Sequence, residues 1–456
     1  MNYEKKFKDK RDELLYASFT WSWGNFDRQI QDEIIYTPLH MNDYLRGDTI
    51  ESDHHHAIAD VHYIYPFSDN SKLEVGYNLN YTKEHSDYEY SFDHVLDPST
   101  SYIFNREEQI HALYATYGFQ VGKQFSAQLG LRGEMVNNDF SREMYSGKRE
   151  AFPKDYNSIY PTVHLSYQVN QMNSFQISYS RRIRRPDPWT MMPNVDLTNQ
   201  EYIRFGNPKI DPEYTNAYEL GYSLMFNKTT IFTSLYYRAV NNAMNRFEFP
   251  WTEDNALLYE FEWAWAVAGA DATTGKTAQT FMNVSKSSNY GMEIIVDRDI
   301  TDWWKANLSM NFFGSYQDGT DLGYDKVRSF NYNAKLNTTF TLPKSWSIQV
   351  SGRYYAPRKT IQGRSDARYD VDIAIKKSIL NKQGNIGINF RDIFDTRGGH
   401  SYSFTDEYIS FSNRHPYSRS IRVSFSYNFG KTANMRKRMQ QQQQQDSYSG
   451  GSFDEE

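Results

Sequence analysis

The chain has 456 residues, a formal charge of −6, a mean hydropathy of −0.78 and no cysteine. Without cysteine it can form no disulfide, thiolate zinc site, Fe–S cluster or cysteine nucleophile. The small net charge gives no reason to expect a nucleic-acid partner. Membrane-spanning helices are excluded as well, because none of its apolar runs reaches the roughly 18 residues that they need.

Alternating apolar and polar residues recur along the chain, with polar breaks between the runs. In chain order, the predicted strands span 12–25, 54–66, 72–86, 104–121, 124–138, 158–169, 174–184, 215–226, 230–246, 284–297, 303–316, 329–341, 346–357, 366–377, 384–395 and 416–429. Each of these sixteen can supply the roughly 9–11 residues of a tilted membrane strand, often with an extension beyond the bilayer. The sequence therefore predicts an all-β fold, a transmembrane antiparallel β-barrel.

The last predicted strand shows the alternation clearly. Ile421, Val423 and Phe425 share one face, whereas Arg422 and Ser424 share the other. Successive side chains of a strand point to opposite faces, so the first set is expected to meet lipid and the second a polar lumen. A low mean hydropathy is compatible with such a wall, because only every second residue faces lipid.

Short and long connections alternate between the predicted strands. The short ones cover 66–71, 122–123, 170–173, 227–229, 299–302, 342–345 and 378–383. The long ones cover 26–53, 87–103, 139–157, 185–214, 247–283 and 396–415. This pattern is typical of periplasmic turns and extracellular loops, and the even strand count places both ends of the barrel in the periplasm.

The chain divides into three predicted parts. Residues 1–11 form a polar lead-in, 12–430 form the barrel, and 431–456 form a disordered periplasmic tail with a basic patch, a glutamine run and an acidic end. Met1 does not begin a signal peptide, since no apolar central region follows it. An outer-membrane protein must be exported, so we expect this chain to be the C-terminal part of a longer one.

Several separated motifs resemble one known family. They include SYSRRIRRP, GNPKIDPEYTNAYELGYS, SNYGMEI and the closing SIRVSFSYNFG, and the resemblance covers nearly all of 63–430. In this order they resemble the outer-membrane β-barrel domain of TonB-dependent receptors of the Bacteroidetes type. The resemblance implies a barrel of about 22 strands around a plug. Six strands, the plug, the TonB-contacting box and the signal sequence would then lie upstream.

The same resemblance implies a function and partners. Such receptors carry out energy-coupled uptake of a bound nutrient, which can be a metal chelate, vitamin, peptide or glycan. The implied partners are the TonB complex, reached through the missing N-terminal part, a small nutrient ligand, and outer-membrane lipid with lipopolysaccharide. The resemblance implies no cofactor.

Arginine and tryptophan residues in the long connections or at the strand end beside them are the candidate ligand-binding residues. They are Arg182, Arg184, Arg185, Trp189, Arg204, Trp263 and Trp265. The arginines, with neighbouring Arg181, could hold an anionic ligand or a lipopolysaccharide phosphate, or instead pair with wall carboxylates such as Glu213 and Glu219. The tryptophans could stack on a ligand ring, or be buried within the folded loop.

Two other motifs carry weaker predictions. The cluster 54–56 holds three histidines with Asp60 nearby, but strand geometry positions too few ligands for a closed metal site. The segment 270–277, ADATTGKT, has alanine where a phosphate loop needs its first glycine, and no strand-loop-helix unit surrounds it. No nucleophile-base-acid set occurs, so neither an enzyme nor a metal site is predicted.

Three functions remain open from the sequence. The first is the transporter barrel. The second is a self-contained porin-like channel of about sixteen strands. The third is a soluble all-β carbohydrate-binding protein, which would not need such long strands or such regular alternation of loops.

Overall fold

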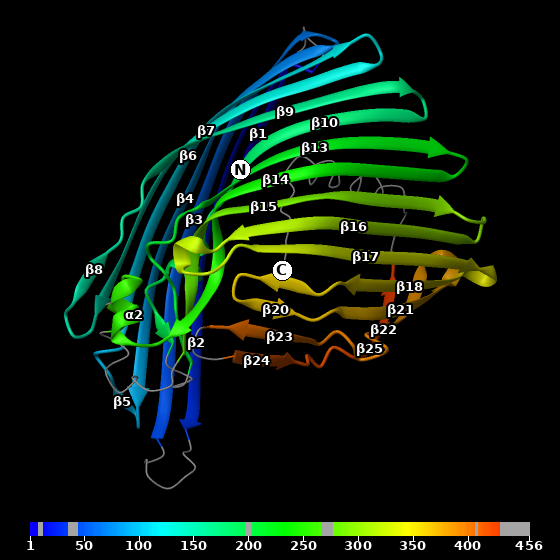
Figure 1. Cartoon of the computed structure of the whole chain (residues 1–456). Coiled ribbons are helices and arrows are strands. Elements are labelled where there is room, and N and C mark those ends of the chain that lie inside the picture. Colours follow the sequence, from blue (N-terminus) through cyan, green and yellow to red (C-terminus); the bar gives the residue numbers. More distant parts are fainter. Residues whose placement is uncertain are drawn as a thin grey trace.

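The computed structural model describes residues 1–7, 12–34, 44–196, 202–261, 263–265, 277–405 and 409–428. Most of its strands belong to one sheet that curls into an incomplete cylinder (Figure 1). None of the described helices is long and apolar enough to cross a membrane. The all-β prediction is confirmed.

Sixteen long strands make the wall of this sheet. They are β2 (Leu14–Ile34), β3 (Tyr44–Ser68), β4 (Ser71–Phe92), β6 (Tyr102–Val121), β7 (Phe125–Met144), β9 (Tyr156–Asn170), β10 (Asn173–Arg184), β13 (Glu213–Phe226), β14 (Thr229–Pro250), β15 (Thr277–Asp299), β16 (Trp304–Asp318), β17 (Val327–Leu342), β18 (Trp346–Tyr355), β21 (Arg368–Ile379), β22 (Gly384–Arg391) and β25 (Ser420–Tyr427). Each pairs antiparallel with the next in this order. The sixteen coincide one for one with the predicted strands.

Smaller elements extend the wall. Its sheet also contains β1 (Asn2–Lys6), β5 (Val95–Leu96), β8 (Arg149–Ala151), β11 (Val195–Asp196) and β12 (Tyr202–Phe205). A second sheet contains β19 (Arg358–Thr360), β20 (Gly363–Ser365), β23 (Gly399–Phe404) and β24 (Ile409–Arg414). The helices are α1 (Pro188–Met191) and α2 (Glu253–Leu258), with short 3-10 turns η2 (Thr320–Leu322), η3 (Pro343–Ser345) and η4 (Leu380–Lys382).

The register places apolar residues on the outward face of the wall. Ile177 on β10 lies directly between Leu165 of β9 and Leu220 of β13. Its side chain is 53% exposed and Leu220 is 44% exposed, so this face has no protein cover. The neighbouring Gln176 points to the opposite side, between Ser166 and Gly221. A wall with lipid outside and water inside requires an apolar outer face and a polar inner face, and this sheet has both.

The short turns gather at one end of the sheet and the long connections at the other (Figure 1). Only Asn227 and Lys228 join β13 to β14, and both have positive φ, 38° and 58°. Two such residues match the twist of the flanking strands, and asparagine tolerates this conformation. We call the two ends of the wall the short-turn end and the long-loop end.

Several predicted loops are largely strand, which corrects the sequence analysis. β2 and β3 stay in register from Leu14↔Ile64 to Ile34↔Tyr44, through most of the predicted loop 26–53. β14 and β15 likewise pair as far as Pro250↔Thr277. The sequence does not reveal these extensions. Beyond the lipid, both faces of a strand carry polar residues, so the alternation of apolar and polar residues disappears. The predicted tail 431–456 lies outside the described residues.

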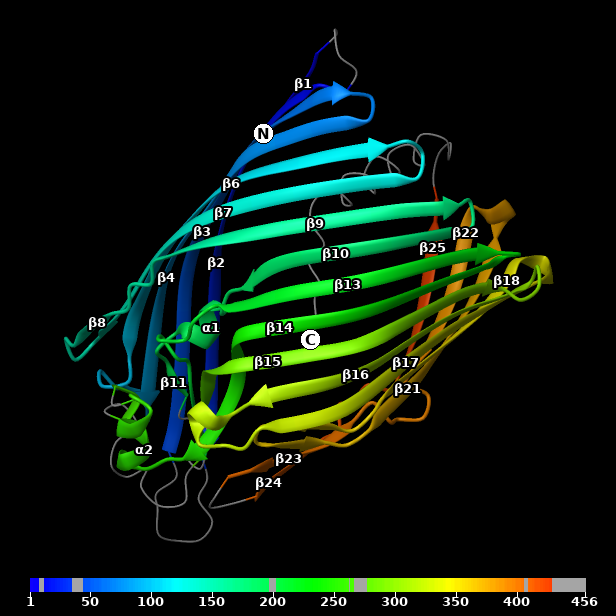
Figure 2. The same ribbon diagram turned by 45° about the horizontal axis from the view of Figure 1, so that its top comes forward.

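The two margins of the sheet are not joined. In the described part of the chain, β25 pairs only with β22, and β1 pairs only with β2. β1 and β25 lie apart in both views (Figure 2). All eight residues of β25 are exposed. A closed pore of sixteen strands would require a ladder between β25 and the β1–β2 margin.

Placing a charge on the outward face is expected to destabilise the wall. Ile177→Arg puts a guanidinium into lipid near the middle of β10, which should lower the free energy of unfolding by about 2 kcal/mol. Urea titration of the protein refolded in lipid vesicles measures this change. Gln176→Arg is the matched control, since its side chain enters the polar interior. Equal destabilisation by both variants would contradict the assignment of faces.

Candidate ligand-binding site

The connection between β10 and β13 is folded rather than loose. Figure 2 shows its elements α1 and β11 at the end of the sheet opposite the short turns after β9, β13 and β15. Asp187 caps α1 by accepting a hydrogen bond from the Thr190 amide at 2.7 Å. Further along, β12 pairs in parallel with the start of β15, Tyr202 opposite Thr277. The connection thereby becomes part of the sheet.

Two apolar clusters hold this connection from both sides. Met191, Met192 and Ile210 are buried with aromatic residues of β4, β6 and β7. On the other side, Ile203 and Phe205 are buried in a cluster with the β14–β15 hairpin and the segment containing α2. Burying such side chains stabilises a fold by roughly 1.5–3 kcal/mol each, so the connection is fixed on the wall.

The Gly-Asn-Pro motif makes a close contact that other residues would prevent. A Cβ at Gly206 would lie 2.2 Å from the carbonyl oxygen of Met192 and 2.8 Å from that of Trp189. Next to it, the side-chain amide of Asn207 donates to the Phe281 carbonyl at 2.9 Å, which ties the connection to β15. The first task of the motif is therefore to hold the connection in place.

A hollow of about 420 Å³ lies between the connection and two hairpins. Arg28 and Arg46 reach it from the β2–β3 hairpin, Arg204 from β12 and Arg246 from β14. The carboxylates that line it are those of Asp48 and Asp196. Four guanidinium groups against two carboxylates give the hollow a net positive charge, which favours an anionic ligand.

Arg46 lies at the centre of this charge. Its side chain is 4% exposed and forms a two-pronged ion pair with Asp48, with Nε–Oδ1 at 2.9 Å and Nη2–Oδ2 at 3.0 Å. Asp196 lies 4.0 Å from Nη2. Nη1 is buried and has no hydrogen-bond partner among the described residues. A buried donor without a partner is costly, and a ligand oxygen would satisfy it.

The ring of Tyr90 packs against the guanidinium of Arg46. Its ring centroid lies 5.6 Å from the guanidinium, a cation–π distance. Its hydroxyl donates to Asn194 Oδ1 at 3.1 Å. Burial, with the negative charge of Asp48 adding to it, raises the pKa of Tyr90 to about 12. The phenol therefore stays neutral and keeps this hydrogen bond at all physiological pH values.

The structure separates the candidate arginines from one another. Arg204 lines the hollow, whereas Arg182 lies in a different one on the inner face of the wall. Arg184 Nη1 is 3.6 Å from Glu213 Oε2, the ion pair given as the alternative. Arg185 pairs with Glu134, a partner that the sequence did not indicate.

The three candidate tryptophans also lie in different surroundings. Trp189 lines the hollow and is 59% exposed. Trp263 is buried in the cluster around Phe205, with the Arg142 guanidinium 4.9 Å from its ring centroid. The Trp265 ring is 5.3 Å from that of Trp251. Trp263 and Trp265 thus pack within the folded connection between β14 and β15.

Sequence reasoning missed three of the four arginines of the hollow. Arg28, Arg46 and Arg246 lie in stretches that were assigned to a loop or to its margin. Their only local signal is the spacing of Arg46 and Asp48, which places both on one face once the segment is known to be a strand. The hairpins that bring the arginines together are far apart in the chain.

The two weaker motifs give no further site. His56 Nε2 lies 2.9 Å from Asn80 Oδ1 on the neighbouring strand. Over the described ranges, no group of three or more histidine and carboxylate side chains could hold a metal ion. Most of the segment 270–277 lies outside those ranges.

Adding a methyl group at Gly206 is expected to loosen the connection. In Gly206→Ala the new Cβ must displace backbone carbonyls, an overpacking that costs about 1–3 kcal/mol. Trypsin cleavage after Arg204 or Lys209, followed by mass spectrometry, should become about tenfold faster. Gly399→Ala, whose Cβ meets nothing within 4 Å, is the control. Unchanged cleavage in Gly206→Ala would show that the contact is not limiting.

Comparison with solved structures shows the same fold in several proteins named as receptors or transporters. The ferric yersiniabactin uptake receptor FyuA from Yersinia pestis matches with a TM-score of 0.61 and 10% identity, over 92% of this chain and 60% of that chain. The ferripyoverdine receptor of the outer membrane of Pseudomonas aeruginosa gives 0.61 and 14%, over 94% and 55%. The ferric citrate transporter FecA gives 0.60 and 13%, over 94% and 60%.

This chain thus spans between half and two thirds of the length of these proteins. At such low sequence identity, the similarity shows a shared fold and nothing further. No curated protein sequence matches the chain. Residues 5–427 match the outer membrane protein beta-barrel family, and the chain belongs to that family.

Proposed function

We propose that this chain forms the barrel wall and the binding face of a TonB-dependent receptor that takes up a small anionic nutrient. The observation that carries the proposal is the hollow with four arginines, in which a buried Arg46 donor lacks a partner. The motif resemblance, the family and the fold shared with proteins named as uptake receptors and transporters support it. We assign no cofactor and no catalytic role to the chain.

The charge and size of the hollow favour one class of nutrient. Guanidinium groups bind carboxylate and phosphate oxygens through paired hydrogen bonds. A volume of about 420 Å³ suits a small molecule. Among metal chelates, vitamins, peptides and glycans, we therefore favour an anionic metal chelate. Arg204 and the exposed Trp189 are the predicted candidates that would contact it.

The proposed orientation follows from the loops. The long-loop end, which carries the hollow, faces the outside, and the short turns with residues 431–456 face the periplasm. Outer-membrane lipid and lipopolysaccharide surround the wall. Contact with the TonB complex would be made by a part of the protein upstream of this chain. That part would also supply the plug and six further strands.

The other two functions have less support. A porin of sixteen strands needs a closed wall, and the described β25 has no ladder to the β1–β2 margin. A soluble carbohydrate-binding protein would not leave side chains such as Ile177 and Leu220 exposed across a whole face.

Uptake is tested in cells that produce the full native protein. We expect ⁵⁵Fe supplied as its citrate, pyrophosphate or catecholate chelate to accumulate above the level of cells lacking the gene, and deletion of TonB to abolish this gain. Arg204→Gln and Arg246→Gln should each raise the half-saturating concentration of the transported chelate about tenfold, because each removes a charge-assisted hydrogen bond.

Arg149→Gln is the control for these variants. Arg149 is exposed on β8, outside the hollow, and its loss removes the same charge. Equal weakening in Arg149→Gln would mean that net charge alone attracts the chelate. Accumulation that persists without TonB, or no accumulation of any of the three chelates, would overturn the proposal.

A further inference from the structure

The ladder between β9 and β10 ends before either strand does. Its last pair is Thr162↔Ser180, whereas β9 continues beside β7 as far as Tyr156 and β10 continues beside β13 as far as Arg184. Pro161 lies at the point of separation, and proline has no N–H to donate to a further ladder. The wall therefore forks between β9 and β10 toward the long-loop end.

A hollow of about 730 Å³, which we call the inner hollow, lies at this fork. Gly130 of β7 lines it, and its chain neighbours Leu129 and Leu131 are exposed on the outward face, so Gly130 itself faces the interior. Thr116 and Thr162 are its partners on the two adjacent strands. A Cβ at Gly130 would lie 2.4 Å from the Thr162 hydroxyl oxygen. The glycine thus leaves room between two hydroxyl groups on the inner face.

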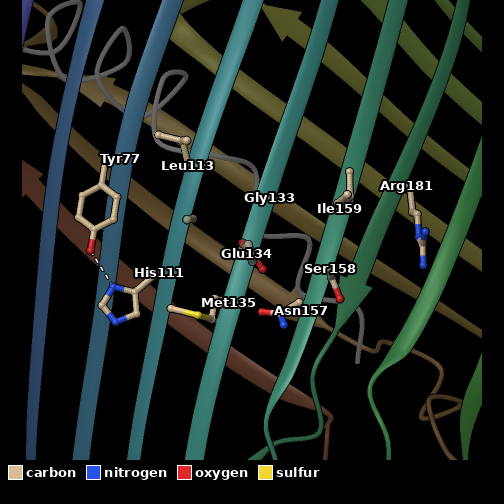
Figure 3. A pocket seen from close by; sticks show the side chains of 11 residues that line it. Tyr77, His111, Leu113, Gly133, Glu134, Met135, Asn157, Ser158, Ile159 and Arg181 are labelled. Atoms are coloured by element: carbon tan, nitrogen blue, oxygen red, sulfur yellow. Dashed lines mark hydrogen bonds between the residues drawn. The ribbon is translucent and has the colours of Figure 1, made fainter.

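The inner hollow has a net positive charge. The charged side chains that line it are Arg132, Arg181, Arg182, Asp60 and Glu134. Glu134 accepts a hydrogen bond from Arg132 Nε at 2.7 Å and also pairs with Arg185, so two guanidinium groups compensate its charge. Figure 3 shows Glu134 on β7 and Arg181 on β10, with the residues of β9 between them. A positive hollow facing the lumen favours an anionic ligand.

The inner hollow also contains donors without partners. Tyr160 is 7% exposed, and its hydroxyl has no hydrogen-bond partner among the described residues. The same holds for the buried Nε of Arg181. Arg182 is exposed and takes part in no ion pair in the described part of the chain. Buried donors without acceptors are costly, and the oxygen atoms of an anion would satisfy them, as at Arg46 in the first hollow.

The two hollows lie along one face of the same strand. Asp48 of β3 lines the hollow around Arg46, and Asp60 of β3 lines the inner hollow. An even number of residues separates them, so both side chains point to the interior, and they lie about 40 Å apart along the strand. Asp60 is the nearer of the two to the short turn between β3 and β4. An anion that moves inward from the first hollow therefore reaches the inner hollow next.

We propose that the inner hollow is a second binding station for the anionic nutrient. Arg182 and the Tyr160 hydroxyl donate hydrogen bonds there to one of its carboxylate or phosphate groups. The proposal rests on the proposed uptake function and extends it, since it gives the nutrient two successive sites along the inner wall. An acidic side chain from a part of the protein upstream of this chain offers the same oxygen chemistry, and the experiment distinguishes the two sources.

The number of bound anions tests the proposal. The full native protein in mild detergent is dialysed to equilibrium against ³²P-labelled pyrophosphate, and we expect two bound per chain. Arg204→Gln should weaken the site in the first hollow and leave the other unchanged. In that background, Arg182→Gln should weaken the remaining site about tenfold, because it removes a charge-assisted hydrogen bond. Tyr160→Phe, which removes only a hydroxyl group, should weaken it about threefold.

Lys335→Gln is the matched control. Lys335 is exposed on β17, and its neighbour Leu336 is 45% exposed on the outward face, so the lysine points to the interior away from both hollows. Both pyrophosphate sites should be unchanged in this variant. Heat-dependent gel mobility verifies that every variant is folded.

Two results would overturn the proposal. A single bound pyrophosphate that Arg182→Gln leaves unchanged would indicate that an upstream acidic side chain fills the inner hollow. Equal weakening by Lys335→Gln and Arg182→Gln would mean that the charge of the whole interior attracts the anion. Because the readout is bound anion, failure of chelate uptake leaves it unaffected. A site that responds to Arg182→Gln but not to Arg204→Gln would contradict the first hollow alone.

Discussion

The structure depends on one constraint, the pairing of every backbone amide and carbonyl group at membrane depth. Lipid offers no hydrogen bonds, so strands there must satisfy each other. The continuous antiparallel ladder from β2 to β25 is the response to this constraint. Once the backbone is satisfied in this way, side chains are free to differ on the two faces. The same ladder then carries the hairpins beyond the bilayer, where it supports the arginines of the hollow.

The wall could be predicted from the sequence because lipid imposes a period of two on it. Alternation such as that of Ile421, Val423 and Phe425 revealed all sixteen long strands. Beyond the lipid both faces of the strands are polar, and the period disappears. The extensions of β2, β3, β14 and β15 are therefore predicted as loops. Arg46 lies in one of these stretches and Arg246 at the margin of another, and neither is among the predicted candidates.

The sequence indicates which residue types are candidates for ligand binding, but not which of them come together in the folded chain. Arg182 and Arg185 are close together at the end of β10, yet they have different surroundings, and Arg204 on β12 has a third. Whether a guanidinium is paired depends on carboxylates such as Glu134, which is brought to Arg185 from another strand. One sequence without its tertiary contacts cannot assign such partners. Gly206 could not be singled out either, since its importance comes from the backbone carbonyls of Met192 and Trp189, which lie against it only in the folded chain.

The four cations of the hollow come from three separate places in the chain. Arg28 and Arg46 belong to the first hairpin, Arg204 to the connection after β10, and Arg246 to a third element. The wall beneath these elements is stable through its own ladder, so a change in one of them leaves the others standing. Selectivity for a new nutrient can therefore evolve one hairpin at a time, through replacements at the rim that the scaffold tolerates.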